Sequence, residues 1–138
     1  MEISPWSKFK LHPTLESQLE KNGLKTPTDV QSQVLFYTNY AVDCIVASKT
    51  GSGKTLCYVL PMLSSILREE VLEDRIQGLV LVPTRELAIQ VYREYKKMLN
   101  EENTKKCRIS LIIGGLSKDK QLRILNKRPH VIVATVGR

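Results

Sequence analysis

Residues 44–55 run Cys44-Ile45-Val46-Ala47-Ser48-Lys49-Thr50-Gly51-Ser52-Gly53-Lys54-Thr55. The apolar run Cys44–Ala47 is typical of a buried strand, and a helical pattern follows from Gly53. Backbone N–H groups can turn inward around phosphates at such a turn because glycine permits the necessary φ angles. The helix N-terminus adds partial positive charge, Lys54 can reach the β- and γ-phosphates, and the Thr55 hydroxyl can ligate Mg²⁺. The stretch therefore predicts a strand, a phosphate-binding loop and a helix.

The loop alone does not name a class of protein. Ser48 stands where the usual first glycine of such loops lies, so a chance glycine-rich turn is the alternative interpretation. The strand before the loop and the helix after it favour a nucleotide site. Kinases, GTPases, transporters and helicases all carry this kind of loop, so other segments must separate them.

Three further apolar runs predict the rest of a sheet: Leu79–Val82, Ser110–Ile113 and Val131–Ala134. Pro83 follows the first run and Gly114 the second. Continuous apolar runs of this length suit strands that are buried on both faces of a parallel sheet. Their alternation with longer amphipathic segments predicts an α/β fold, a three-layer domain with right-handed crossovers.

The amphipathic segments predict the helices. Apolar spacing gives one helix entered through Thr14 and a second capped by Thr28 or Asp29. A third runs from Gly53 to Leu67 through Pro61, and a short basic one covers 116–125. Three apolar faces are predicted, and their residues are Leu15, Leu19 and Leu24 in the first helix, Val30, Val34 and Leu35 in the second, and Leu87, Val91, Tyr95, Met98 and Leu99 in a helix after Pro83.

Composition indicates a globular domain of 138 residues, 42% of them hydrophobic and 25% charged. The formal net charge of +7 favours polyanionic partners such as nucleic acid. Three cysteines without metal-type spacing predict no zinc site and no disulfide framework; Cys44 and Cys57 lie in apolar stretches and are expected to be buried free thiols. The absence of a signal peptide or a long apolar run predicts a soluble intracellular protein.

Four further segments decide the class. They are Gly23-Leu24-Lys25-Thr26-Pro27-Thr28-Asp29-Val30-Gln31, Pro83-Thr84-Arg85-Glu86-Leu87-Ala88-Ile89-Gln90, Gly114-Gly115, and Thr135-Val136-Gly137-Arg138. Together with the phosphate loop, they resemble, in order, the motifs of DEAD-box RNA helicases, with Val136 in place of the family's proline. The loop resembles the family's Ala-x-Thr-Gly-Ser-Gly-Lys-Thr form, which accounts for Ser48. The resemblance covers nearly the whole chain and implies a RecA-like domain.

The resemblance implies an ATP site with Mg²⁺. Gln31 would pair with the N6 and N7 edge of adenine, which its amide donor and acceptor suit. Trp6, seventeen residues before Gly23, would stack on the base; Phe9 is the competing aromatic residue, and a hydrophobic anchor is the alternative role for Trp6. Lys54 and Thr55 are the expected catalytic residues, with Thr55 on the metal. The implied nucleotide-binding residues are Trp6, Lys25, Gln31, Ser48, Thr50, Gly51, Ser52, Gly53, Lys54 and Thr55.

The same resemblance implies contacts with the RNA backbone that do not read bases and weaken with salt. The residues are Pro83, Thr84, Arg85, Gly114, Gly115, Thr135, Gly137 and Arg138. For Arg85 a structural salt bridge is the alternative. The other basic residues are expected to be solvated helix faces. Segments such as Gly114–Ser117 and Leu125–Pro129 also resemble the ribosome-assembly branch that acts on the large subunit, which implies pre-ribosomal RNA and a nuclear, nucleolar location.

The Asp-Glu-Ala-Asp segment of the family does not occur in these 138 residues. We expect residues 1–138 to be part of a first RecA-like domain, with an adenine-reading helical segment at 1–40 and the phosphate-loop core at 41–138. The chain alone should bind ATP weakly and hydrolyse it negligibly, as a monomer, whereas its parent would be an ATP-dependent RNA helicase. A non-catalytic nucleotide- and RNA-binding module is the alternative, and a small kinase is a third interpretation that leaves Gln31 and Pro83–Gln90 unexplained.

Overall fold

A computed structural model describes residues 3–38, 40 and 42–137 of the chain. The chain divides into two compact units, Met1–Arg68 and Glu69–Arg138. The first unit holds a 3-10 turn, η1 (Ser7–Phe9), and three helices, α1 (Pro13–Lys21), α2 (Asp29–Thr38) and α3 (Lys54–Leu67). The second unit alternates strands and helices: β1 (Gly78–Val82), α4 (Arg85–Lys97), α5 (Glu101–Lys106), β2 (Ile109–Ile112), α6 (Lys118–Asn126) and β3 (Val131–Thr135).

The sheet of the second unit is parallel, and β3 is its central strand, in the order β1-β3-β2. Gly78 pairs with Val131 on one side of β3, and Ile109 pairs with the same residue on the other. Every residue of β3 is buried, as expected for a strand that is covered on both faces and both edges. The structure thus confirms the predicted α/β fold with a parallel sheet.

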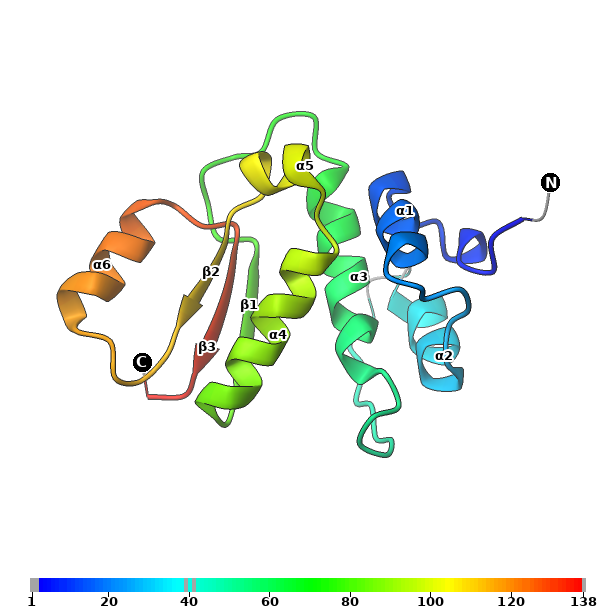
Figure 1. Cartoon of the computed structure of the whole chain (residues 1–138), viewed down its shortest axis with the longest axis horizontal. Helices are drawn as coiled ribbons and strands as arrows, with labels where there is room; N and C mark the ends of the chain where they lie inside the picture. Colours follow the sequence, from blue (N-terminus) through cyan, green and yellow to red (C-terminus); the bar gives the residue numbers. More distant parts are fainter. Residues whose placement is uncertain (1–2, 39, 41, 138) are drawn as a thin grey trace. The chain divides into compact units, whose positions relative to one another are not determined.

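Helices lie on both faces of this sheet, and Figure 1 shows α4 and α6 on opposite sides of the strands. Leu79 and Leu81 of β1 are 57% and 59% exposed, so the predicted burial on both faces is wrong for this strand. On one face, Ile124 of α6 packs against Ile112, Ile132 and Ala134. Since side chains alternate along a strand, Val131 and Val133 point to the other face, where α4 contacts all three strands. Val91 and Tyr95 of α4 are buried, but Leu87, predicted for the same buried stripe, is 36% exposed. The buried face of α4 therefore runs through Ala88, Val91 and Tyr95, and Leu87 lies at its edge.

The core of the first unit is aliphatic. Its fully buried side chains are Leu15, Leu19, Leu35, Val59, Leu60 and Leu63. Helix α3 contains Pro61 without ending there, as predicted. The cap of α1 is His12, whose Nδ1 accepts from Thr14 N–H at 3.3 Å, so the predicted entry through Thr14 is wrong. Leu24 lies beyond the end of α1, and its N–H donates to the carbonyl of Leu19 at 2.9 Å.

The predicted strand Cys44–Ala47 does not form. These residues carry no strand assignment, Ile45 is fully exposed and Cys44 is an exposed thiol rather than a buried one. An extended run becomes a strand only beside another strand that takes up its N–H and C=O groups, and no such pairing involves these residues in the described chain. Cys57 and Cys107 are buried.

Candidate nucleotide and RNA site

The phosphate loop lies directly before α3. Gly53 has φ +93° and is the cap residue before Lys54, so the loop enters the helix through a left-handed conformation that favours glycine. Thr50 and Gly51 are exposed, and Gly53, Lys54 and Thr55 are half-buried. The unpaired N–H groups at the start of this 14-residue helix face the loop, which is the arrangement that binds anions.

Lys54 is folded back onto the loop. Its Nζ donates to the carbonyl of Ser48 at 2.6 Å and to that of Lys49 at 2.8 Å. These carbonyls hold the ammonium where a phosphate would otherwise be its partner. The side chains of Ser48 and Ser52 also meet across the loop, with 2.5 Å between their hydroxyl oxygens. The loop is therefore closed on itself by side chains from both of its ends.

The N-terminus of α2 is joined to this loop by Gln31. Its Oε1 accepts from Thr28 N–H at 2.9 Å and Thr28 Oγ1 accepts from Gln31 N–H at 3.4 Å, which is a capping box. Gln31 Nε2 donates to the carbonyl of Gly53 at 3.1 Å, and Thr28 Oγ1 donates to the carbonyl of Ser52 at 2.8 Å. Gln31 is only 4% exposed. One amide thus caps a helix and touches the phosphate loop.

Trp6 and Lys25, the other two residues predicted to hold the nucleotide, come before α2 in the chain. Trp6 is 2% exposed, and its Nε1 donates to the carbonyl of Leu24 at 2.7 Å, which places its ring against the segment that precedes α2. Lys25 follows Leu24 and is exposed. Phe9 is 3% exposed, as expected of a core residue.

The loop residues fit a nucleotide's phosphates better than they fit a metal ion alone. Free N–H groups at the α3 N-terminus and the ammonium of Lys54 are donors, which suit phosphate oxygens. The hydroxyl of Thr55 could supply one ligand to Mg²⁺, but the described residues hold no group of three His, Cys, Asp or Glu that could complete a metal site. Magnesium would therefore arrive with the phosphates and depend on them for further oxygen ligands.

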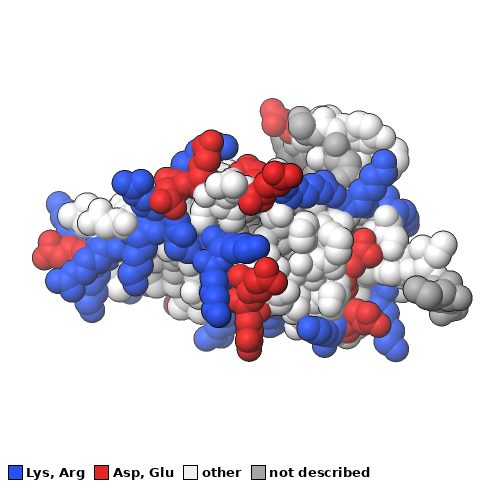
Figure 2. Space-filling model, turned by 90° about the horizontal axis from the view of Figure 1, so that it is seen from above, with Lys and Arg blue, Asp and Glu red and all other residues white. Residues whose placement is uncertain are grey.

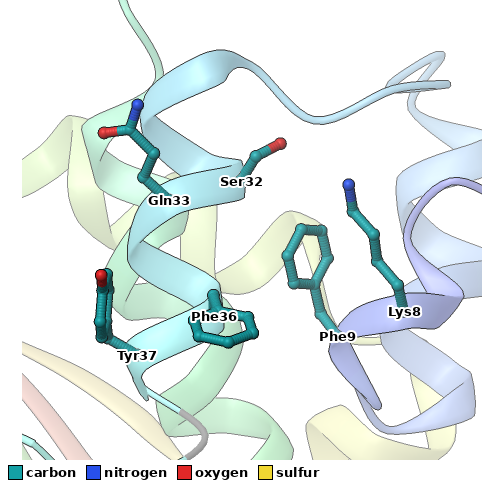
Figure 3. A pocket seen from close by; sticks show the side chains of 6 residues that line it. All are labelled: Lys8, Phe9, Ser32, Gln33, Phe36 and Tyr37. Carbon is teal, nitrogen blue, oxygen red and sulfur yellow. The ribbon is translucent and has the colours of Figure 1, made fainter.

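A separate pocket of about 510 Å³ lies between η1 and α2, and sequence reasoning did not find it (Figure 3). Lys8 and Phe9 line one side of it, and Ser32, Gln33, Phe36 and Tyr37 of α2 line the other. The ammonium of Lys8 lies 5.0 Å from the centre of the Phe9 ring. None of the residues predicted to hold the nucleotide lines this pocket.

The second unit gathers the predicted RNA residues at the carboxyl ends of its strands. Thr84 follows β1 and caps α4, its Oγ1 accepting from Leu87 N–H at 3.2 Å. Gly114 follows β2 and donates from its N–H to Oγ1 of Thr135, the last residue of β3, at 3.3 Å. Carboxyl ends of parallel strands are where open α/β sheets bind ligands.

Arg85 lies against the glycine pair. A Cβ at Gly114 would lie 3.3 Å from Arg85 Nη2, and one at Gly115 would lie 3.0 Å from Nη1. Gly115 also has φ +92°, a conformation that few other residues adopt. Among the described residues Arg85 makes no ion pair, so the geometry offers no support for a structural salt bridge. Pro83 and Gly137 are exposed, and Arg138 falls outside the described residues.

The amino-terminal edge of the same sheet holds a polar cluster that sequence reasoning missed. His130 is 1% exposed and its Nδ1 accepts from Arg108 N–H at 2.9 Å, while its Nε2 is buried without a partner among the described residues. Arg108 Nη2 pairs with Asp74 at 2.5 Å. Burial of the imidazole and, to a smaller extent, the nearby positive charge of Arg108 lower the pKa of His130. Burial raises the pKa of Cys107 to about 11. These groups lie at the end of the sheet opposite the glycine pair.

Comparison with known proteins gives one family. The model of the DEAD/DEAH box helicase family matches residues 28–138. The ATP-dependent RNA helicase mak5 of Schizosaccharomyces pombe is 41% identical over 138 residues, which is 100% of this chain and 21% of that protein. The DEAD-box ATP-dependent RNA helicase CshB of Bacillus subtilis is 33% identical over 138 residues, 100% of this chain and 31% of that protein.

Solved structures agree in fold. The RNA helicase Prp28 from Chaetomium thermophilum, solved bound to ADP, superposes with a TM-score of 0.82 at 32% identity, over 99% of this chain and 33% of that one. A hypothetical ATP-dependent RNA helicase from Sulfolobus tokodaii gives a TM-score of 0.78 at 27% identity, over 93% of this chain and 35% of that one. The chain spans about a fifth to a third of the length of these relatives. None of its described helices is long and apolar enough to cross a membrane.

Proposed function

Because the chain belongs to the DEAD/DEAH box helicase family, whose model matches residues 28–138, we propose that it is the ATP- and RNA-binding part of an ATP-dependent RNA helicase. The contact that carries this proposal is the hydrogen bond from Gln31 Nε2 to the carbonyl of Gly53. It joins the segment expected to read adenine to the loop expected to hold phosphates. A phosphate loop of another class gives no reason for that junction.

In this proposal the loop residues bind and orient the nucleotide. The N–H groups at the start of α3 hold phosphate oxygens, and Lys54 exchanges the carbonyls of Ser48 and Lys49 for the β- and γ-phosphates. Thr55 supplies a hydroxyl to Mg²⁺, which neutralises charge on the phosphates when bound. Gln31 keeps one amide hydrogen and one carbonyl lone pair beyond its two bonds, which suffices for the N6 and N7 edge of adenine. Trp6 and Lys25 complete the proposed base site. Thr50, Gly51, Ser52 and Gly53 shape the proposed phosphate site, and Ser48 contributes its backbone at the start of the loop.

RNA would lie along the carboxyl edge of the sheet. Thr84, Arg85, Gly115 and Thr135 offer hydroxyl, guanidinium and backbone N–H donors there, which suit sugar and phosphate oxygens rather than base edges. Gly137 and Arg138 follow Thr135 and would extend this contact. Hydrolysis and strand separation are proposed for the parent protein, since an attacking water needs an acidic partner that residues 48–55 do not contain.

Pre-ribosomal RNA is the proposed substrate, and the nucleolus the proposed location. Both rest on the resemblance of Gly114–Ser117 and Leu125–Pro129 to the ribosome-assembly branch. Crosslinking of the protein to RNA in its native cells tests the substrate: recovery of messenger RNA with no pre-ribosomal RNA contradicts it.

Calorimetric titration with ADP tests the nucleotide assignment. Lys54→Ala should abolish measurable binding, whereas Lys49→Ala, a lysine of the same loop, should leave the affinity within about twofold because its exposed side chain makes no contact with the loop carbonyls. Unchanged ADP affinity in Lys54→Ala would remove the assignment. A second titration compares ADP with GDP: Gln31→Ala should reduce the preference for adenine. Equal preference before and after means that Gln31 acts on the loop and does not read the base.

A further inference from the structure

Helix α6 carries a one-sided row of exposed basic residues. Lys120, Arg123 and Lys127 lie three and four residues apart, a spacing that places them on one side of the helix. Each is exposed, whereas Gln121 and Ile124 are half-buried, Ile124 against the sheet. We call the three exposed residues the α6 row. Figure 2 shows Lys and Arg side chains gathered over the end of the second unit that holds α6.

The charge of this row is not balanced by acidic neighbours. Between Lys118 and Arg128 the sequence has five basic residues and one acidic residue, Asp119. Within the part of the chain that the structure describes, no residue of the α6 row makes an ion pair. Helix α5 differs, because it sets Glu101 and Glu102 against two lysines and pairs Lys106 with Glu102 at 3.2 Å. Uncompensated charge on one side of a helix raises the local concentration of anions.

The row also continues a surface already described. Helix α6 begins three residues after Gly115 and is capped by Ser117, whose Oγ accepts from Lys120 N–H at 3.3 Å. Its first turn therefore follows the glycine pair closely in the chain, and its last turn leads to the amino-terminal end of β3. From Lys120 to Lys127 the helix advances about 10 Å. The row thus leads away from the carboxyl edge along the outside of the sheet.

We propose that the α6 row is an additional RNA-backbone contact, which binds the part of a single strand that extends beyond the glycine pair. This inference rests on the proposal that the carboxyl edge binds RNA. Three cations in a row suit successive phosphates of one strand, and no aromatic side chain lies on α6 to stack on bases. The contact would therefore add affinity for longer RNA without adding sequence preference.

Fluorescence anisotropy with the whole chain tests this with a short oligouridine of about 5 nucleotides and a long one of about 15. The test variant is Lys120→Gln/Arg123→Gln/Lys127→Gln. The matched control is Lys21→Gln/Arg93→Gln/Lys105→Gln, which removes the same charge from exposed positions on α1, α4 and α5 that make no ion pair among the described residues. The test variant should bind the long RNA about tenfold more weakly at low salt, with the slope of log affinity against log salt reduced by about 2. Its affinity for the short RNA should equal that of the control.

Arg85→Ala separates this inference from the proposed function, because it should weaken both RNAs. If the test variant and the control bind the long RNA with equal affinity, the inference is overturned and the proposed function is unaffected. Binding of neither RNA by the wild-type chain overturns both. A last titration uses oligoglutamate. If the test variant loses affinity for oligoglutamate but not for the long RNA, the surface binds an acidic protein and the RNA contact is overturned.

Discussion

Gln31 Nε2 donates a hydrogen bond of 3.1 Å to the carbonyl of Gly53. The same nitrogen occupies the space beside Gly53, because a Cβ on residue 53 would clash with it. Gln31 cannot move aside freely, because it is 4% exposed and its Oε1 accepts from Thr28 N–H. The end of the phosphate loop therefore packs closely against the start of α2, with Gln31 hydrogen-bonded to both.

Gly53→Ala should be the most damaging small substitution in the loop. A Cβ there would overlap Gln31 Nε2, and φ +93° adds about 1–3 kcal/mol of strain for a residue other than glycine. Gly51→Ala is the matched control, since it also has positive φ but a Cβ would meet nothing within 4 Å. Chemical denaturation and ADP titration should both rank Gly53→Ala well below Gly51→Ala. Equal losses in the two variants would mean that strain alone decides and that Gln31 does not restrict residue 53.

Ser48→Ala should strengthen nucleotide binding. The hydroxyls of Ser48 and Ser52 are 2.5 Å apart across the loop, and this contact must open if Ser52 is to face a phosphate. Removing an exposed hydrogen bond of this kind changes affinity by about threefold. The expected result is a lower Kd for ADP with an unchanged denaturation midpoint. A weaker ADP complex would show instead that the Ser48 hydroxyl helps to shape the phosphate site.

The stability of the chain should fall in mild acid. Burial and, to a smaller extent, the positive charge of Arg108 lower the pKa of His130 below its ordinary value of 6.5. A base with a lower pKa in the folded state binds its proton more tightly when unfolded, so the free energy of unfolding decreases as pH falls below about 6.5 and is unaffected above it. Urea denaturation at pH 7.5 and pH 5.5 should show a smaller decrease for His130→Asn than for the wild type. Burial and Arg68 lower the pKa of His12 too, so His12→Asn serves as the parallel test.

Only one of the three thiols should react in the native chain. Cys44 is exposed, whereas burial raises the pKa of Cys57 and takes that of Cys107 to about 11. Because the thiolate is the nucleophile, a pKa of 11 slows alkylation about 100-fold even before access is considered. Mass spectrometry after iodoacetamide treatment at pH 8 should find one adduct, on Cys44, and three adducts after denaturation. Rapid native labelling of Cys107 would contradict the buried position.

The strands of the sheet were predictable because each is a short apolar run ended by glycine, proline or a polar residue. Leu79–Val82 and Val131–Ala134 each fall within one residue of the observed bounds. The run Cys44–Ala47 has the same local pattern and fails, since pairing depends on distant chain and not on the run itself. Helix α5 was missed because Glu101–Lys106 has no apolar stripe and depends on its Asn100 cap.

The candidate site divides in a similar way. The family resemblance assigned Arg85 and Gly114–Gly115 to one RNA surface, and the Arg85 guanidinium lies against the glycine pair; the RNA contact itself stays a prediction. The bonds of Gln31 to Thr28 and Gly53 were not predicted, since a side-chain amide carries no periodic signal. The partner-free Nε2 of His130 was equally hidden, because burial is a property of the folded chain.

The central position of β3 imposes an order on synthesis. Among the described residues β1 and β2 each pair with β3, yet β3 is made after both, about 50 residues after β1. At about 5–20 residues per second, β1 waits about 2–10 s for its partner strand and β2 about 1–4 s. In that interval the backbone N–H and C=O groups of β1 are unpaired, and Val82, which the folded sheet buries, is open to other proteins. Nascent chains of this protein should therefore recruit chaperones until Thr135 has emerged.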